Sequence, residues 1–376
     1  MRLESEEVRN VQVVVVRPDE LGAADLATWT ELQSRDESLD SPFLSPQFAK
    51  AVGRVRSGTR VAVLSDTTGI VGFFPFERTR GRRGVALAKG LSDTQGLVTP
   101  TTVDLDLGDL LRICDLELLE FDHLLGTQEK WVTSLPSRLT RERSPALDLR
   151  DGFDAYVQQR QATSKSLVQS TARKRRKLER EHGPVRLVFD EPRHDLLDEV
   201  LSQKSHQYRR TGRRDRFADP GNRALVHDLL DVRAPTFGAP LTVLYAGDSM
   251  VAAHLGLRSR TTMAWWFPVY DQRFAAYSPG LVMCLDLARH MVDENLSLLD
   301  LGRGDESYKD RLSNTEIGLL SGSVAQRRTS QAMHTARRWP GERVEKMVLG
   351  SPRLRAFARS TLAQAGQLRE RLGGAE

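Results

Sequence analysis

An order of strands and helices that occurs twice constrains this fold more than any other sequence feature. In the first half, the hydrophobic pattern predicts a strand at 11–16, helices at 21–33 and 46–55, antiparallel strands from 60 to 77, and a helix running into a strand at 105–119. After a short strand at 146–149 and a helix at 153–181, the same order returns in a strand at 185–189, helices at 195–211 and 222–230, a meander from 241 to 270, a helix at 281–292 and a strand at 298–301. A chain of 376 residues is long enough for two cores. We therefore expect two α/β domains of one fold in preference to one large sheet.

The expected domains are an N-terminal domain at 1–145, a second domain at 146–325 and a basic helical tail at 326–376. The tail has helical composition with breaks at Pro340-Gly341 and Ser351-Pro352. It carries 11 Arg and Lys residues against 4 Asp and Glu, a net charge of +7, whereas the whole chain carries +5. Negatively charged partners should meet such a segment first.

Composition narrows the class of protein. Hydrophobic residues make up 39% of the chain and charged residues 28%, as in soluble globular proteins. The acidic, polar N-terminus has no signal-peptide shape, so we expect a cytoplasmic enzyme. Cys114 and Cys284 lie far apart, with no second cysteine or histidine cluster nearby. We expect buried structural cysteines, no disulfide framework and no metal site.

A second basic segment, at 173–180, has six Arg or Lys residues in eight positions. These residues spread around a helix, with Leu178 as the only apolar anchor, so we expect exposure on most sides. One interpretation is a solvated helix end, where cations suit the dipole. The other is an anion-binding arm for a phosphorylated or lipid-linked acceptor at an anionic membrane surface. Aromatic residues are scarce in both basic segments, which disfavours nucleic acid as a partner.

The start of the helix that follows the aromatic strand at 262–270 predicts an anion site. Ser278 suits the N-cap and Pro279 the first helical position. Gly280 then leaves the free N–H groups of the helix start open to a ligand, and such groups attract phosphate. A well-capped helix start without a ligand would have the same sequence.

The loop after the strand at 298–301 carries polar groups to the same edge of the sheet. Two parallel strands joined by a helix bring their carboxyl ends together, where α/β sheets bind ligands. The loop at 302–310 contains Asp305, Glu306, Tyr308 and Lys309, and Lys309 is a rare lysine in an Arg-rich chain. A solvated loop explains such charges about as well as catalysis does.

The segments 265–291 and 299–312 resemble the cellulose-biosynthesis-associated (CelD/BcsL-type) branch of the GNAT acetyltransferases, which is similar to the Fem-type peptidyltransferases. The segments 41–52, 90–100 and 174–185 add to this resemblance. It implies two tandem GNAT-like α/β domains and an acyl-CoA donor, acetyl-CoA or another, bound by the second. The pantetheine arm would lie along the strand at Phe267, Val269 and Tyr270, and the pyrophosphate at Ser278, Pro279 and Gly280.

The implied activity is acyl transfer to an amine or hydroxyl, with a small-molecule or cell-envelope acceptor. A backbone N–H near Val269 or Tyr270 would polarise the thioester carbonyl. Asp305, Glu306 or His254 would take the acceptor's proton, although His254 also suits a core position. Tyr308 could protonate the thiolate, and Lys309 could orient a phosphate or carboxylate.

Two alternatives stay open. One is a Fem-like transferase that uses aminoacyl-tRNA. The other is a non-catalytic scaffold, because Gly280 alone remains of the usual phosphate-loop glycines and Pro268 removes a strand donor. Asp93, in the first half, is interpreted either as a turn residue or as an acceptor contact across the cleft between the halves.

Overall fold

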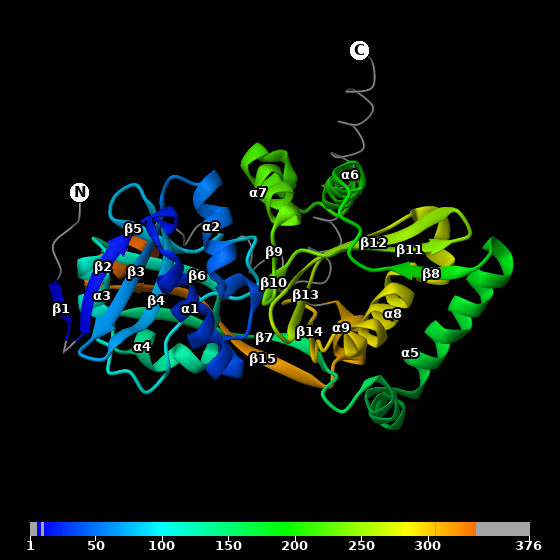
Figure 1. Cartoon of the computed structure of the whole chain (residues 1–376), viewed down its shortest axis with the longest axis horizontal. Coiled ribbons are helices and arrows are strands. Elements are labelled where there is room, and N and C mark those ends of the chain that lie inside the picture. The colour runs from blue at the N-terminus through cyan, green and yellow to red at the C-terminus, as the bar shows by residue number, and fades with distance from the viewer. Residues whose placement is uncertain (1–5, 9–10, 305, 336–376) are drawn as a thin grey trace, which may run out of the picture.

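The computed structural model describes residues 6–8, 11–304 and 306–335 (Figure 1). After a short strand β1 (Glu6–Val8), the first half contains in order β2 (Val11–Val16), α1 (Ala23–Arg35), α2 (Pro46–Val55), β3 (Thr59–Asp66), β4 (Gly69–Thr79), β5 (Arg83–Ala86), α3 (Leu107–Ile113), β6 (Leu118–Leu125), α4 (Glu129–Thr133) and β7 (Ser137–Asp148). The helix α5 (Phe153–His182) connects it to the second half.

The second half contains in order β8 (Val185–Val188), α6 (His194–Arg210), α7 (Pro220–Asp231), the short β9 (Arg233–Ala234) and β10 (Phe237–Gly238), then β11 (Leu241–Ala246), β12 (Ser249–Arg258), β13 (Thr262–Tyr270), α8 (Pro279–Asp293), β14 (Leu298–Asp300), α9 (Ser307–Leu312) and β15 (Thr315–Ala325). Each half thus has a strand, two helices, an antiparallel meander, a helix, a parallel strand, a short helix and a last strand. The predicted repeat of mixed α/β architecture is confirmed.

The two halves share one sheet, whereas the sequence led us to expect two domains in preference to one large sheet. The described strands form a 15-stranded sheet in the order β1-β2-β3-β4-β5-β6-β15-β7-β14-β13-β12-β10-β9, with β11 and β8 continuing from β12. The last strands are exchanged, because β7 pairs with β14 of the second half and β15 pairs with β6 of the first. With 12 and 11 residues, β7 and β15 are long enough to pair with each other as well. This exchange joins two repeated units without a break in hydrogen bonding.

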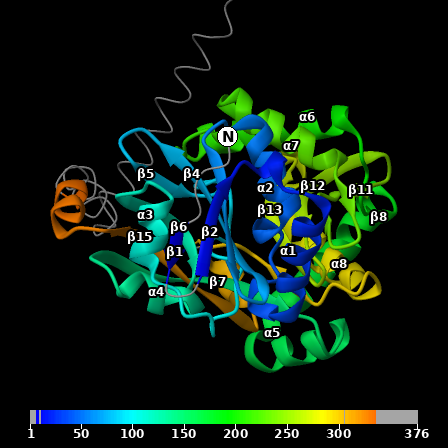
Figure 2. The ribbon, with the colours of Figure 1, turned by 60° about the vertical axis from the view of Figure 1, so that its left-hand side comes forward.

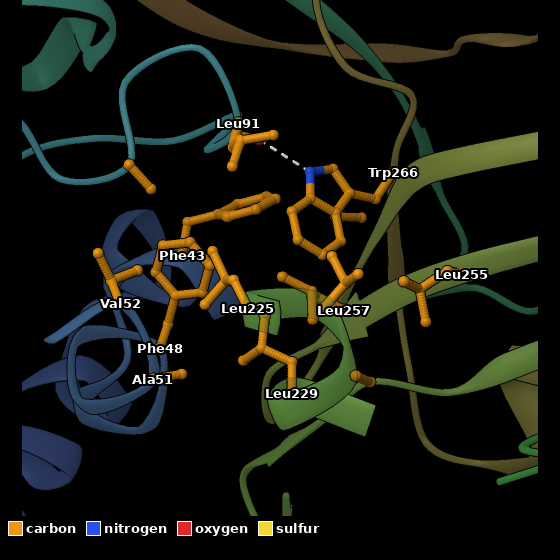
Figure 3. Close-up of a cluster of buried hydrophobic side chains, with 14 of the residues drawn as sticks. Phe43, Phe48, Ala51, Val52, Leu91, Leu225, Leu229, Leu255, Leu257 and Trp266 are labelled. Carbon is orange, nitrogen blue, oxygen red and sulfur yellow. Dashed lines mark hydrogen bonds between the residues drawn. The ribbon is translucent and has the colours of Figure 1, made fainter. Parts of the chain in front are cut away.

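A shared hydrophobic core fixes the halves against each other. Buried residues of α1 and α2 cluster with those of α6, α7 and β11–β13. Figures 1 and 2 show α2 and α7 side by side over the junction, and Arg54 of α2 pairs there with Asp228 of α7. Phe43 meets Trp266 edge-on with ring centroids 5.6 Å apart, and the Trp266 indole N–H donates to the Leu91 carbonyl at 2.8 Å (Figure 3). A large apolar interface of this kind makes rigid placement of one half on the other the expected state.

The long helix α5 crosses the second half and packs against α8 and α9 (Figure 1). In the part of the chain that the structure describes, no helix combines the length and the apolar character needed to cross a bilayer. Of the predicted basic tail, residues 336–376 lie outside the described residues. Its first part packs on β15 and β6, where Gln331 donates to Ser323 at 3.0 Å and His334 pairs with Glu120.

Candidate active site

The strand β13 leaves its parallel neighbour partway along its length. Thr262, Met263 and Ala264 pair with β14, and the rest of β13 runs on to Tyr270 without it. On its other edge β13 stays paired with β12 up to Tyr270. This opening, at the carboxyl ends of β13 and β14, is where the fold leaves strand edge groups for a ligand.

His254 is a structural residue of the bulge between β12 and β13. The register shifts between Leu255 and Leu257, and the N–H of Trp266 donates to His254 Nε2 at 3.2 Å. The imidazole has no exposed surface and stacks on Trp265 with centroids 4.3 Å apart. Burial lowers the pKa of His254 to about 3, so the ring stays neutral. Its basic nitrogen is already in use, which favours the core interpretation over the proton-accepting one.

Alternation along β13 decides which backbone groups face the opening. The N–H of Asp271 donates to Val251 at 3.0 Å, so Phe267 and Val269 also direct their backbone groups to β12, and Pro268 and Tyr270 direct theirs away. The side chains of Phe267 and Val269 are buried in the shared core. Of the two residues considered for the polarising N–H, Tyr270 therefore has the available group, and its side chain is 36% exposed.

Lys204 of α6 reaches the same edge of β13. Its Nζ donates to the Pro268 carbonyl at 2.8 Å, and the side chain is 8% exposed. Burial, with the nearby charges of Arg213 and Arg216, lowers the pKa of Lys204 to about 7. A buried amine with a pKa near neutrality is the kind of group that occurs at functional sites.

The start of α8 lacks the side-chain cap that the sequence predicted. Pro279 is at the first helical position as expected, but Ser278 is left-handed, with φ 51° and ψ 55°, and its hydroxyl makes no capping bond. The hydroxyl accepts instead from Lys174 Nζ at 2.7 Å. A Cβ added to Gly280 would meet only Tyr270, at 3.8 Å, so there is open space over the first turn. Pro279 has no N–H and the N–H of Leu281 donates to the Ser278 carbonyl at 2.9 Å, so the Gly280 N–H is left for a ligand. This N–H and the ammonium of Lys174 together make a positive site.

The basic segment of α5 is less exposed than its composition suggested. Lys174 and Arg175 are half-buried because α5 packs along α8, and Arg175 pairs with Asp286 at 2.9 Å. Leu178 is fully buried, whereas Arg173 and Arg176 remain exposed. One face of the segment thus contributes to the start of α8, and the opposite face meets solvent.

The loop after β14 is held by Lys309. Its Nζ donates to the carbonyls of Gly302 at 2.9 Å and Arg303 at 3.2 Å, and lies 3.3 Å from Glu306 Oε2. These contacts use the donors that a ligand phosphate would need. Glu306 also pairs with Arg213, and the two cations outweigh burial and lower its pKa. Lys309 and Glu306 thus fix the loop, and Asp305 lies outside the described residues.

Tyr308 of α9 lies on the opposite face of β13 from Lys204. Its hydroxyl is hydrogen-bonded to Trp265 and close to Cys284, and burial raises its pKa. The phenol therefore keeps its proton at neutral pH. Burial also raises the pKa of the Cys284 thiol to about 12, and both Cys114 and Cys284 are buried free thiols, as predicted.

Asp93 crosses from the first half to the second. Its Oδ2 lies 3.4 Å from where a Cβ on Gly302 would stand, and its Oδ1 lies 4.0 Å from His123 Nε2. Burial, opposed by His123 and reinforced by Asp300, raises the pKa of Asp93 to about 6. The side chain keeps 20% of its surface exposed. Asp93 is thus a reachable carboxylate with a pKa near neutrality, which a general base requires.

Asp300 supports this position from the second half. Its carboxylate accepts from Ser144 and from the Gly302 N–H, and burial raises its pKa. Sequence reasoning assigned no role to Lys204 or Asp300, because each is a single polar residue in a segment with an ordinary core pattern. The only signal in the sequence for Lys204 was the rarity of lysine, which was applied to Lys309 alone.

Residues 165–310 match the family model described as an acetyltransferase (GNAT) domain. No curated protein matches the chain. The structure of L-PGS from Bacillus licheniformis is similar, with 12% identity, a TM-score of 0.53, and coverage of 85% of this chain and 97% of that one. The C-terminal DUF2156 domain of an Agrobacterium fabrum protein has 12% identity, a TM-score of 0.52, and coverage of 83% and 96%.

FemX has the same fold, with 7% identity, a TM-score of 0.53, and coverage of 80% of this chain and 95% of that chain. At these identities the likeness concerns the fold. The matched segment contains β13, the start of α8, Lys204, Lys174 and Tyr308, so the described opening lies inside the acetyltransferase domain. The domain match and the GNAT fold support an N-acyltransferase.

Proposed function

We propose that this protein transfers an acyl group from acyl-CoA to an amine or hydroxyl of an acceptor held between its two halves. The observation that carries the proposal is the uncapped start of α8, with the ammonium of Lys174 beside it. A cation next to the positive end of a helix is unfavourable on its own. An anion at this place, such as a donor pyrophosphate, would stabilise both the ammonium of Lys174 and the positive end of α8.

The residues present fit such a donor in two respects. Gly280 leaves the first turn of α8 open, and Tyr270 directs its backbone N–H into the opening beside β13. When bound, the donor supplies an acyl thioester. Lys174 and the Gly280 N–H would hold its phosphates, and the Tyr270 N–H would stabilise negative charge at the acyl carbonyl.

Proton movements would use groups on both faces of β13. Asp93, whose pKa is near neutrality, accepts the acceptor's proton. Tyr308, protonated at neutral pH, donates a proton to the departing thiolate. Lys309 and Glu306 keep the loop after β14 in place.

One observation favours the alternative donor, aminoacyl-tRNA. Pro268 has no N–H, and its carbonyl is already bonded to Lys204, so β13 offers a pantetheine arm fewer backbone partners. Calorimetry with coenzyme A and with aminoacyl-tRNA separates the donors. Coenzyme A binding that Gly280→Asp removes supports the proposal, tRNA binding alone supports the alternative, and binding of neither supports a non-catalytic scaffold.

A further inference from the structure

The end of α6 and the loop after it carry five exposed arginines in eight positions, Arg209, Arg210, Arg213, Arg214 and Arg216, here named the arginine loop. Arg213 pairs with Glu306 at 2.9 Å. Among the described residues, the other four guanidinium groups have no carboxylate within ion-pair distance. The one acid within the loop, Asp215, accepts from the Phe217 N–H and the Ser205 hydroxyl. The loop therefore presents a concentrated and largely uncompensated positive charge.

Buried aromatic residues anchor the arginine loop. Phe217 is 3% exposed and meets Phe267 of β13 edge-on, with centroids 4.8 Å apart. Tyr208, in the last turns of α6, is also buried and lies beside Phe217. The Arg213–Glu306 pair ties the loop to the start of α9. The guanidinium groups are thus carried by a fixed loop whose ordering cost is met by folding.

The arginine loop lies on the face of the sheet that α6 and α7 cover. The helices α6 and α7 pack in the core shared by the two halves, whereas α8 and α5 pack in the core on the other face of the sheet. The charge of Arg216 acts on both Asp93 and Lys204. The start of α8, where the donor phosphates are placed, belongs to the other face. The two positive sites therefore lie on different faces of the sheet.

We propose that the arginine loop binds a phosphate group of the acceptor and so delivers the acceptor's nucleophile to Asp93. That the bound molecule is the acceptor rests on the proposed function, whereas the anion site itself does not. Guanidinium groups bind phosphate oxygens in bidentate fashion, and several neighbouring ones match a multiply charged phosphate better than a single carboxylate. The phosphate can belong to a soluble phosphate ester or to a lipid headgroup.

The test measures inorganic pyrophosphate binding by calorimetry in the Gly280→Asp variant, where the start of α8 is blocked. Arg209→Gln, Arg210→Gln and Arg214→Gln together should weaken that binding at least about tenfold, because hydrogen bonds to charged groups are among the stronger ones. A matched control changes the exposed Arg173, Arg176 and Arg180 of α5 to Gln. It removes the same charge and should leave the affinity within about twofold.

Vesicle sedimentation separates the two sources of phosphate. Binding to phosphatidylcholine vesicles that contain phosphatidylglycerol, lost in the arginine-loop variant only, indicates a lipid headgroup, and pyrophosphate binding without vesicle binding indicates a soluble ester. Equal losses in the arginine-loop and α5 variants would overturn the proposal, as would binding of neither probe. Coenzyme A affinity, measured in protein with Gly280 intact, tests the proposed function separately and should not change in the arginine-loop variant.

Discussion

The two halves have the same order of elements but differ in the space beside their parallel strand pairs, β5–β6 and β13–β14. In the first half, the chain returns to the sheet after the short β5: Gln95 pairs with Leu124 of β6, and Val98 pairs with Phe73 of β4. The chain itself thus fills the space that the end of β5 leaves between β4 and β6. In the second half, β13 continues beyond β14 and its edge stays open apart from Lys204. A unit with this order of elements can thus be closed or open depending on one loop.

The helix starts differ in the same sense. In α3 the Asp106 carboxylate accepts from the N–H groups of Gly108 and Asp109, so the helix start is capped and negative. In α8, its counterpart, Ser278 provides no cap and Lys174 adds a positive charge. The start of α3 therefore lacks the unoccupied donor and the nearby cation that the start of α8 offers an anion. The gap-filling loop of the first half instead supplies Asp93 to the second half.

The largest effect is expected from removing the carboxylate that the first half contributes to the site of the second. Asp93→Asn should lower the rate of acyl transfer by about 10² to 10⁴, because it removes the proton acceptor. In the wild type, the rate should rise with pH through about 6, the pKa of Asp93, as the carboxylate ionises. Donor affinity should stay unchanged. A variant that keeps its rate and its pH profile would show that Asp93 is only a turn residue.

Gly280→Asp should make the start of α8 resemble that of α3. The added carboxylate repels phosphate, and coenzyme A affinity in calorimetry should fall about 100-fold, since two charges close together in a site of low dielectric interact strongly. The fold should be kept, because a Cβ there has room and an acid suits the first turn. Gly280→Asn, of equal size but neutral, should retain much more affinity. Equal losses in both variants would indicate steric blocking rather than charge.

Lys204 tests whether the open edge is held open at a cost in stability. Its pKa in the folded protein, about 7, is below the ordinary value of 10.5, so the unfolded chain binds more protons between these pH values. Lys204 therefore makes stability rise with pH over this window. Lys204→Met should remove that rise in urea unfolding and stabilise the protein by about 2 kcal/mol at pH 7, while lowering activity. A destabilised variant would mean that the bond to Pro268 outweighs the burial of the ammonium.

The smallest effect is expected in the closed half. Asp106→Ala removes the cap of α3 and should lower the free energy of unfolding by about 1 kcal/mol. Coenzyme A affinity should not change, because α3 packs on β1 and β2, which lie far from β13 in the sheet order. Binding of coenzyme A at a second site in this variant would indicate that the Asp106 carboxylate alone prevents anion binding at the start of α3.

Local sequence patterns determined most of the elements. The ends of α2 and β13 were predicted to the residue, the antiparallel strands predicted from 60 to 77 pair as β3 and β4, and β13 and β14 are parallel as predicted. Periodicity and turn residues act within a few positions, so they can be read without knowledge of the fold. The same reasoning identified the start of α8 and the loop after β14 as converging groups.

Only the tertiary structure decided how those groups are used. The strand β15 was not predicted, and β7 was predicted only at its end. Gly318 and Gly322 interrupt the pattern of β15, and its stability comes from pairing with strands of both halves. Lys204 lies 64 residues from Pro268 in sequence and Asp93 lies farther away, and only the packing of α6 and of the first half brings them to β13 and β14. The sequence alone determined which segments form helices and strands, because those preferences are local. The exchange of last strands, the filled gap of the first half and the buried amine beside β13 depend on long-range contacts that no local pattern encodes.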